Sequence, residues 1–157
     1  MIESLRTQLY QEGDPMPALM RNISAISRCA AAYRQEKLAP FGLKAVHASY
    51  LATLCRNPGV TQEQLAKLVF VNKSNAARQL AVLEEAGFVE RRPSEDDKRA
   101  VLVYPTEKAQ EVLPQIRQTF RDWEALIAVD LSEEERQLVV TMLDKMKNQA
   151  ANWMEEH

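Results

Sequence analysis

Residues 72–83 combine positive charge with hydrogen-bonding side chains in a pattern that suits contact with nucleic acid. The segment contains two cations, Lys73 and Arg78, and no acidic residue. In a helix, steps of about 100° per residue place Ser74, Asn75 and Arg78 on the outer side, opposite an apolar stripe. We therefore expect Ser74, Asn75 and Arg78 to reach base edges and Lys73 to bind phosphate. The alternative is an ordinary solvated helix face.

A second basic group surrounds a charged turn later in the chain. Arg91 and Arg92 precede the acidic residues of this turn, of which Asp97 is the last, and Lys98 and Arg99 follow them. We expect Arg91 and Arg92 to bind phosphates, with Lys98 as a further DNA-binding candidate. Asp97 can hold Arg99 extended, so that its guanidinium enters a narrow minor groove already oriented. The alternative is a salt-bridged exposed turn that contributes little.

The overall charge gives no support to nucleic-acid binding, so these local groups must carry the argument. The chain has 20 Lys and Arg against 22 Asp and Glu, a net charge of −2. The charges are nevertheless sorted, because the segment that begins at Lys73 is basic at its start and carries Glu84 and Glu85 at its far end. A helix dipole adds to the attraction of that start for phosphate.

The elements that must position these groups are mainly helical. With only 4 glycines in 157 residues and 46% hydrophobic residues, the composition is that of an ordinary globular protein. Apolar residues at helical spacing predict one helix from about Pro17 to Leu38 and another from about Leu43 to Arg56. A proline and a glycine between them end the first helix.

Two short helices joined by a tight turn follow, and then a hairpin. Thr61 and Gln64 form a capping box at the start of the first short helix, and Asn72 caps the second. Runs of β-prone residues at 88–92 and 100–104 predict two strands around the charged turn. The fold class is therefore mainly α with a small β-hairpin wing. In this winged helix-turn-helix arrangement the second short helix enters the DNA major groove and the hairpin reaches sideways.

Two long helices with continuous apolar seams close the chain. The first runs from Thr106 to about Asp130 with Pro114 inside it, and the second begins at a capping box formed by Ser132 and Glu135. Their seams expose more apolar surface than one protomer easily covers, which favours a homodimer over an intramolecular bundle. We expect an N-terminal arm at 1–16, dimerisation helices at 17–42 and 106–157, and a winged helix-turn-helix DNA-binding domain at 43–105.

The wing segment carries the most specific motif in the chain. Asp97, Lys98 and Arg99 are followed by a β run and then by Thr106. The segment 61–106 thereby resembles the MarR family of bacterial winged-helix transcriptional regulators, whose wing signature is Asp, any residue, Arg and a later Leu-Thr pair. Pro105 replaces the Leu of that pair. The resemblance implies a homodimeric regulator that reads a pseudo-palindromic site on double-stranded DNA, and we expect a repressor that a small ligand releases.

The resemblance also implies a ligand cleft between the dimer helices and the winged domain, where small phenolic or other anionic aromatic compounds bind. Arg28, Tyr33, His47 and Tyr50 lie near that junction in the first two helices and supply a cation, two phenols and an imidazole. They are the candidate residues for a small aromatic or anionic effector. The alternative is a satisfied histidine and ordinary half-buried tyrosines.

The two cysteines, Cys29 and Cys55, exclude a multi-bridge disulfide framework and are expected to be free thiols. Arg28 and Arg56 stand next to them, and a neighbouring positive charge lowers a thiol pKa. A thiol redox-responsive regulator is therefore an alternative, against buried and inert cysteines. His47 has no other His or Cys at ligand spacing, so no metal site is expected.

The sequence gives no signal for an enzyme or for a membrane protein. The sequence shows no Gly-rich phosphate loop or metal cluster and only one internal His, so we expect neither an enzyme nor a cofactor. No apolar stretch approaches the roughly 18 residues that cross a bilayer, and the start lacks a secretory pattern, so we expect a cytoplasmic protein without a membrane partner. A winged-helix protein interaction module without sequence-specific DNA binding stays an alternative, favoured by the overall acidity and by Ala76 and Ala77 in the second short helix.

Overall fold

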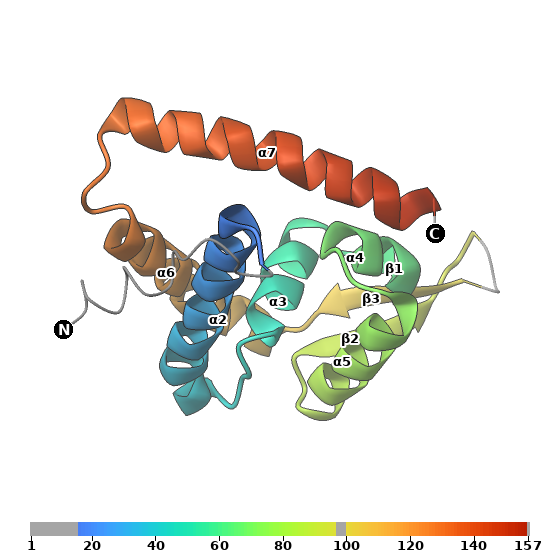
Figure 1. Cartoon of the computed structure of the whole chain (residues 1–157). Helices are drawn as coiled ribbons and strands as arrows, with labels where there is room; N and C mark the ends of the chain where they lie inside the picture. Colours follow the sequence, from blue (N-terminus) through green and yellow to red (C-terminus); the bar gives the residue numbers. More distant parts are fainter. Residues whose placement is uncertain (1–15, 97–99, 157) are drawn as a thin grey trace.

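The computed structural model describes residues 16–96 and 100–156 and confirms the mainly α fold with a small β wing (Figure 1). Residues 1–15 of the arm predicted at 1–16 and the wing residues 97–99 lie outside the described residues. In chain order the elements are α2 (Ala18–Leu38), η1 (Ala39–Phe41), α3 (His47–Arg56), β1 (Val60–Thr61), α4 (Gln62–Leu68), α5 (Lys73–Glu85), β2 (Val89–Pro93), β3 (Val101–Pro105), α6 (Glu107–Ile127) and α7 (Glu133–Glu156).

The start of α3 lies four residues later than the sequence predicts. Gly42 adopts a left-handed conformation with φ of 72°, which a glycine tolerates without strain, and turns the chain after η1. The backbone N–H groups of Lys44 and Ala45 then donate to the side chains of His47 and Gln35, at 3.1 and 3.0 Å. Because these contacts hold the chain in a turn, regular helix begins only at His47.

The helix-turn-helix unit, α4 and α5, forms as its capping residues predict. Thr61 Oγ1 accepts from the N–H of Gln64 at 3.1 Å, and Gln64 Oε1 accepts from the N–H of Thr61 at 2.8 Å, which confirms the capping box. In the turn Phe70 has φ of 56°, and it alone among the described non-glycine residues has a positive φ. Asn72 then caps α5 by accepting from the N–H of Asn75 at 2.7 Å.

The wing belongs to a three-stranded antiparallel sheet in the order β1-β3-β2. Val103 of β3 pairs with Val60 of β1 on one side and with Arg91 of β2 on the other. The sequence did not predict β1, because a strand of two residues is too short to show a period. This strand ties the wing to the segment that leads directly into α4.

The apolar core lies around α3 and joins the winged region to α2 and α6. Leu51 and Leu54 of α3 are fully buried together with one leucine of α2 and residues of α4, α5, β3 and α6, namely Leu38, Leu65, Leu80, Leu83, Val103 and Ile116. Burial of a leucine of this kind stabilises the fold by about 1.5–3 kcal/mol. The core therefore packs α5, the sheet and α6 together.

Hydrogen bonds from the start of α6 reach the end of α5. Thr106 occupies the N-cap position, but its hydroxyl makes no bond to the helix and instead donates to the carbonyl of Gly87 at 2.7 Å. The backbone N–H of Thr106 donates to Phe88 O at 3.0 Å, and Lys108 Nζ donates to Ala86 O at 2.7 Å. These bonds join the beginning of α6 to the end of α5.

The last helix, α7, stands apart as a separate layer across α2, α3 and α4 (Figure 1). Its capping box is confirmed, since Ser132 N–H donates to Glu135 Oε2 at 2.7 Å and Glu135 N–H donates to Ser132 Oγ at 3.2 Å. No side chain from Glu133 to Glu155 is buried. The exposed side chains of α7 include many large apolar ones: Leu138, Val139, Val140, Met142, Leu143, Trp153 and Met154. The described protomer thus leaves the apolar stripe of α7 open to solvent.

Candidate nucleic-acid interface

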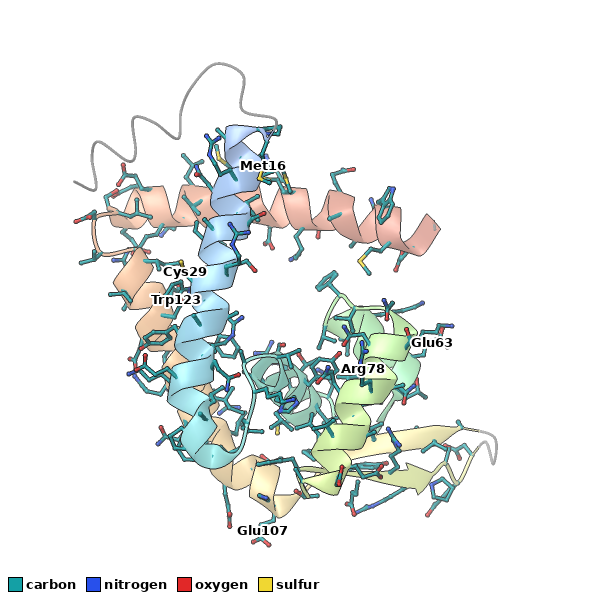
Figure 2. The ribbon with its side chains drawn as sticks, turned by 60° about the horizontal axis from the view of Figure 1, so that its bottom comes forward. Met16, Cys29, Glu63, Arg78, Glu107 and Trp123 are labelled. Atoms are coloured by element: carbon teal, nitrogen blue, oxygen red, sulfur yellow. The ribbon has the colours of Figure 1, made fainter. Side chains whose placement is uncertain are left out.

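The helix α5 presents a polar side to solvent and an apolar side to the core. Ala76 and Leu80 are fully buried, whereas Ser74 and Arg78 are exposed and Asn75 is half-buried. Figure 2 shows Arg78 on α5, on the same side of the molecule as the wing. The structure therefore brings together the three side chains expected to reach base edges.

The first turn of α5 is held in place by its cap. Asn72 Oδ1 accepts from the backbone N–H of Asn75 and also from the hydroxyl of Ser74, at 2.7 and 3.0 Å. The Ser74 hydroxyl has given its proton to this cap, so it can act toward a ligand only as an acceptor. The cap thus fixes both the direction of the helix start and the hydrogen-bonding sense of Ser74.

The three described candidates for phosphate binding are each paired with a glutamate. Lys73 Nζ lies 2.9 Å from Glu63 Oε1 of α4, and both side chains are exposed. The hydrogen bond and charge of Lys73 hold the pKa of Glu63 below its ordinary value. Arg91 Nη1 lies 3.1 Å from Glu84 Oε2, which connects β2 to the far end of α5. Surface ion pairs of this kind contribute little in water and can be exchanged for phosphate.

The third pair holds Arg92 along the wing. Its guanidinium bonds to Glu90 of the same strand and lies 4.8 Å from the ring centroid of Tyr104 on β3. A cation over an aromatic ring is attracted by the electron density of the ring face. The aromatic contact keeps Arg92 on the strand surface, where its exposed guanidinium remains within reach of a ligand.

Arg78 differs from these cations, because it makes no ion pair with any residue in 16–96 or 100–156. Its charge acts instead on Tyr50, a buried residue of α3. Burial raises the pKa of Tyr50, and the positive charge of Arg78 opposes this change without cancelling it. Arg78 is therefore an exposed cation that no carboxylate neutralises within the described protomer.

The four candidate effector residues do not lie together in one site. Arg28 is exposed on α2, and the ring of Tyr33 packs against Trp123 of α6 with centroids 5.3 Å apart. His47 and Tyr50 are buried, with 2% and 1% of their surfaces exposed. The Tyr50 hydroxyl donates toward α5. The two phenols therefore lie in different parts of the protomer.

A cavity of about 720 Å³ lies elsewhere, between the turn that joins α4 to α5 and the end of α7. Its apolar lining includes Phe70 and Val71 of the turn and Ala151 and Met154 of α7. None of the four candidate effector residues lines it. The sequence contains no local signal for this cavity, because its walls are about 80 residues apart in the chain.

The two thiols have different surroundings. Cys29 is exposed on α2, on the side that faces α6 in Figure 2, and Cys55 is half-buried. Burial raises the pKa of Cys55, and Arg117 of α6 acts in the opposite direction.

Among the described residues no group of His, Cys, Asp and Glu side chains is placed to hold a metal ion. None of the described helices is both long enough and apolar enough to span a bilayer.

Comparison with known proteins gives consistent matches. A model described as MarR family matches residues 41–100. The chain is 28% identical over 139 residues to YybA of Bacillus subtilis, an uncharacterized HTH-type transcriptional regulator, and the match covers 88% of this chain and 93% of YybA. It is also similar to the crystal structure of the transcriptional regulator SlyA, with 30% identity, a TM-score of 0.83, and coverage of 90% of this chain and 100% of SlyA.

A further solved structure is that of a MarR family transcriptional regulator from Listeria monocytogenes complexed with 26mer DNA. It is 26% identical, has a TM-score of 0.82, and is covered over 91% of its length by 87% of this chain. These matches extend well beyond the winged region and include the long helices that flank it. The chain belongs to the MarR family of winged helix-turn-helix transcriptional regulators.

Proposed function

We propose that this regulator binds a pseudo-palindromic site on double-stranded DNA as a homodimer, with α5 of each protomer in the major groove. The observation that carries the proposal is the exposed side of α5. Ser74 and Arg78 stand there beside the half-buried Asn75, and the capped helix start attracts anions. The Listeria regulator complexed with DNA supports this use of the shared fold.

Each candidate residue has a separate role in this proposal. Ser74, Asn75 and Arg78 contact base edges, which supply sequence preference. Lys73, Arg91 and Arg92 contact phosphates, which position the protein and make binding sensitive to salt. In the complex these three cations exchange their glutamate partners for phosphate oxygens.

The tip of the wing supplies the minor-groove contact. Arg99, held extended by Asp97, enters the groove beside the site that α5 reads, and Lys98 adds a positive charge next to it. These three residues lie outside the described ranges, so the proposal for them rests on the order of charges in the turn. We expect Arg99→Ala to weaken binding most on sites with A·T-rich flanks.

The dimer is supported by the apolar surface of the flanking helices. Large apolar side chains are exposed along α7, at the end of α6 and at the start of α2, including Leu19, Met20, Leu126, Ile127 and Leu143. One protomer leaves this surface uncovered, and a two-fold partner would bury it. In this arrangement 17–42 and 106–157 serve dimerisation and 43–105 serves DNA binding.

The input signal is a small aromatic or anionic effector that releases a repressor from DNA. Arg28 and Tyr33 on α2 are the accessible candidates to contact it, because His47 and Tyr50 are buried in the protomer. Oxidation of the exposed Cys29 is the alternative input. Both inputs act on the helices that flank the DNA-binding domain.

Selection of bound sequences from a random DNA pool, followed by titration at several salt concentrations, tests the proposal. We expect an inverted repeat whose half-sites lie about one helical turn apart, and affinity that falls steeply as salt rises. Weak binding without sequence preference would contradict it. The glutamate pairing of Lys73, Arg91 and Arg92 would then favour the alternative, a protein interaction module.

A further inference from the structure

Tyr50 connects the buried core to the exposed side of α5. It is among the largest fully buried side chains of the described protomer, with 1% of its surface exposed. Its hydroxyl donates to Oδ1 of Asn75 at 3.2 Å, across 25 positions of the sequence. A buried hydroxyl proton without an acceptor destabilises a fold, and Tyr50 has no other acceptor within the described residues.

The direction of this hydrogen bond determines the orientation of the Asn75 amide. If the amide were flipped, its Nδ2 would face Tyr50 and the hydroxyl proton would lose its acceptor. The backbone of Asn75 is fixed as well, because its N–H donates to the Asn72 cap at 2.7 Å. Only the two hydrogens on Nδ2 are then left to point away from Tyr50.

We propose that Tyr50 is a positioning residue that sets the base preference of Asn75 by holding its Oδ1 inward and leaving Nδ2 as the group presented to DNA. This inference rests on the proposed binding of α5 to DNA. Arg78, one turn further along α5, lies close enough for its charge to act on Tyr50, so the positioning contact lies at the same surface.

The chemistry of base edges turns this orientation into a preference. An asparagine with both ends of its amide available contacts adenine twice, by donating to N7 and by accepting from N6. With Oδ1 turned inward to Tyr50, Asn75 presents its Nδ2 donor to DNA in place of the full amide edge. A donor matches the N7 and O6 acceptors of guanine and the O4 acceptor of thymine. At adenine it matches N7 alone and lies beside the N6 donor, so adenine loses its second hydrogen bond and its advantage over guanine and thymine at the position that Asn75 reads.

The test is Tyr50→Phe, which removes the hydroxyl and keeps the ring. Sequences selected from a random DNA pool by the wild-type full-length protein and by the variant are compared position by position. We expect the variant to accept adenine at one position of each half-site, with relative preference for adenine raised about tenfold. Binding to random DNA stays the same, because phosphate contacts do not involve Tyr50.

Three further variants separate positioning from stability. Thr119→Val also removes a buried hydroxyl, one that donates to the Gln115 carbonyl within α6, and should leave every base preference unchanged. Asn75→Ala should abolish the preference at the same position that Tyr50→Phe alters, and the double variant should match Asn75→Ala alone. Asn75 is half-buried at the helix surface, so Asn75→Ala gives a folded comparison even if Tyr50→Phe does not fold.

The outcomes are distinguishable. If the wild-type protein selects a motif and Tyr50→Phe selects the same motif with the same preferences, the positioning role is wrong and DNA binding stands. If Tyr50→Phe and Asn75→Ala change different positions, the positioning role is also wrong. If the wild-type protein selects no motif at all, the proposed function fails and this inference fails with it.

Discussion

Nζ of Lys73 lies 2.9 Å from Oε1 of Glu63, so the first residue of α5 is paired with the second residue of α4. The pair links the two helices of the helix-turn-helix at the end that faces phosphate in the proposed complex. A carboxylate at this place competes with DNA for the lysine. We therefore expect Glu63 to weaken DNA binding while it holds Lys73 in a defined position.

Replacing this acid should strengthen binding. We expect Glu63→Gln to raise affinity about two- to threefold for random and selected duplexes alike, because Lys73 is released for phosphate. Fluorescence anisotropy with a labelled duplex measures the change. The double variant Glu63→Gln with Lys73→Gln should lose the gain, and a gain that survives there would show that Lys73 is not the phosphate ligand.

Arg78 should contribute to sequence preference rather than to general affinity. We expect Arg78→Ala to weaken binding to the selected site by about 1–3 kcal/mol and to relax one position of that site. Arg78→Lys keeps the charge but loses the planar fork, so it should retain binding to random DNA and still relax the position. An equal loss on selected and random DNA would identify Arg78 as a phosphate contact only.

The exposed stripe of α7 should hold the dimer together. Val139 and Leu143 are 42% and 47% exposed in the protomer, so Leu143→Glu leaves the protomer core intact and places a charge in the proposed interface. We expect sedimentation velocity to show a monomer for Leu143→Glu and a dimer for the control Asn148→Glu, on the polar side of the same helix. A dimer that persists in Leu143→Glu at micromolar concentration contradicts this assignment of α7.

His47 should make stability depend on pH. Burial lowers its pKa below the ordinary value of about 6.5. A hydrogen-bonding effect of Gln79 opposes this change in part, and the charge of Lys44 adds a smaller lowering. Its Nδ1 accepts from the N–H of Lys44 at 3.1 Å, which requires that nitrogen to be unprotonated. The unfolded chain therefore binds the proton at higher pH than the folded protein, and the free energy of unfolding falls as pH drops below about 6.5.

Thermal unfolding between about pH 7.5 and pH 5 measures this dependence. His47→Gln keeps an acceptor for the Lys44 N–H but does not titrate, so we expect it to flatten the decrease in Tm toward acid. If wild type and His47→Gln lose the same amount of Tm over this range, other groups cause the pH dependence.

The two thiols should differ in reactivity. Cys29 is exposed, whereas Cys55 is half-buried and its pKa is raised by burial. Since the thiolate is the reactive form, a thiol reagent at neutral pH should modify Cys29 much faster than Cys55. The variants Cys29→Ser and Cys55→Ser show which cysteine gives the fast phase of the reaction with the reagent and which gives the slow phase. A Cys55 that reacts as fast as Cys29 would contradict the protection that the fold gives it.

Local signals in the sequence predict the elements well. The capping boxes at Thr61 and Ser132 depend on residues three apart, and both form as the sequence predicts. The start of α3 is missed, because contacts from His47 and from Gln35 of α2 hold the preceding residues in a turn. The strand β1 is missed because its two residues are defined by a partner about 40 positions away.

The sequence predicts which residues form the candidate site, but not the hydrogen bond that joins Asn75 to Tyr50 of another helix. Helical phase alone places Ser74 and Arg78 outside and Ala76 inside. The bond between Tyr50 and Asn75 joins two helices whose relative position is set by the core, so no spacing in the sequence reveals it. The same reason explains why Tyr50, a candidate for effector contact by its type and place in the chain, is buried instead.

The hydrogen bonds that fasten the beginning of α6 to the end of α5 have a mechanical consequence. Thr106 donates to the carbonyl of Gly87 and Lys108 donates to the carbonyl of Ala86. The same helix, α6, continues into the proposed dimer interface. We expect α6 to act as a lever arm: a small tilt at the two-fold axis swings the attached α5 without bending it. In a dimer, a small rearrangement between the two α6 helices would then change the distance between the two α5 helices.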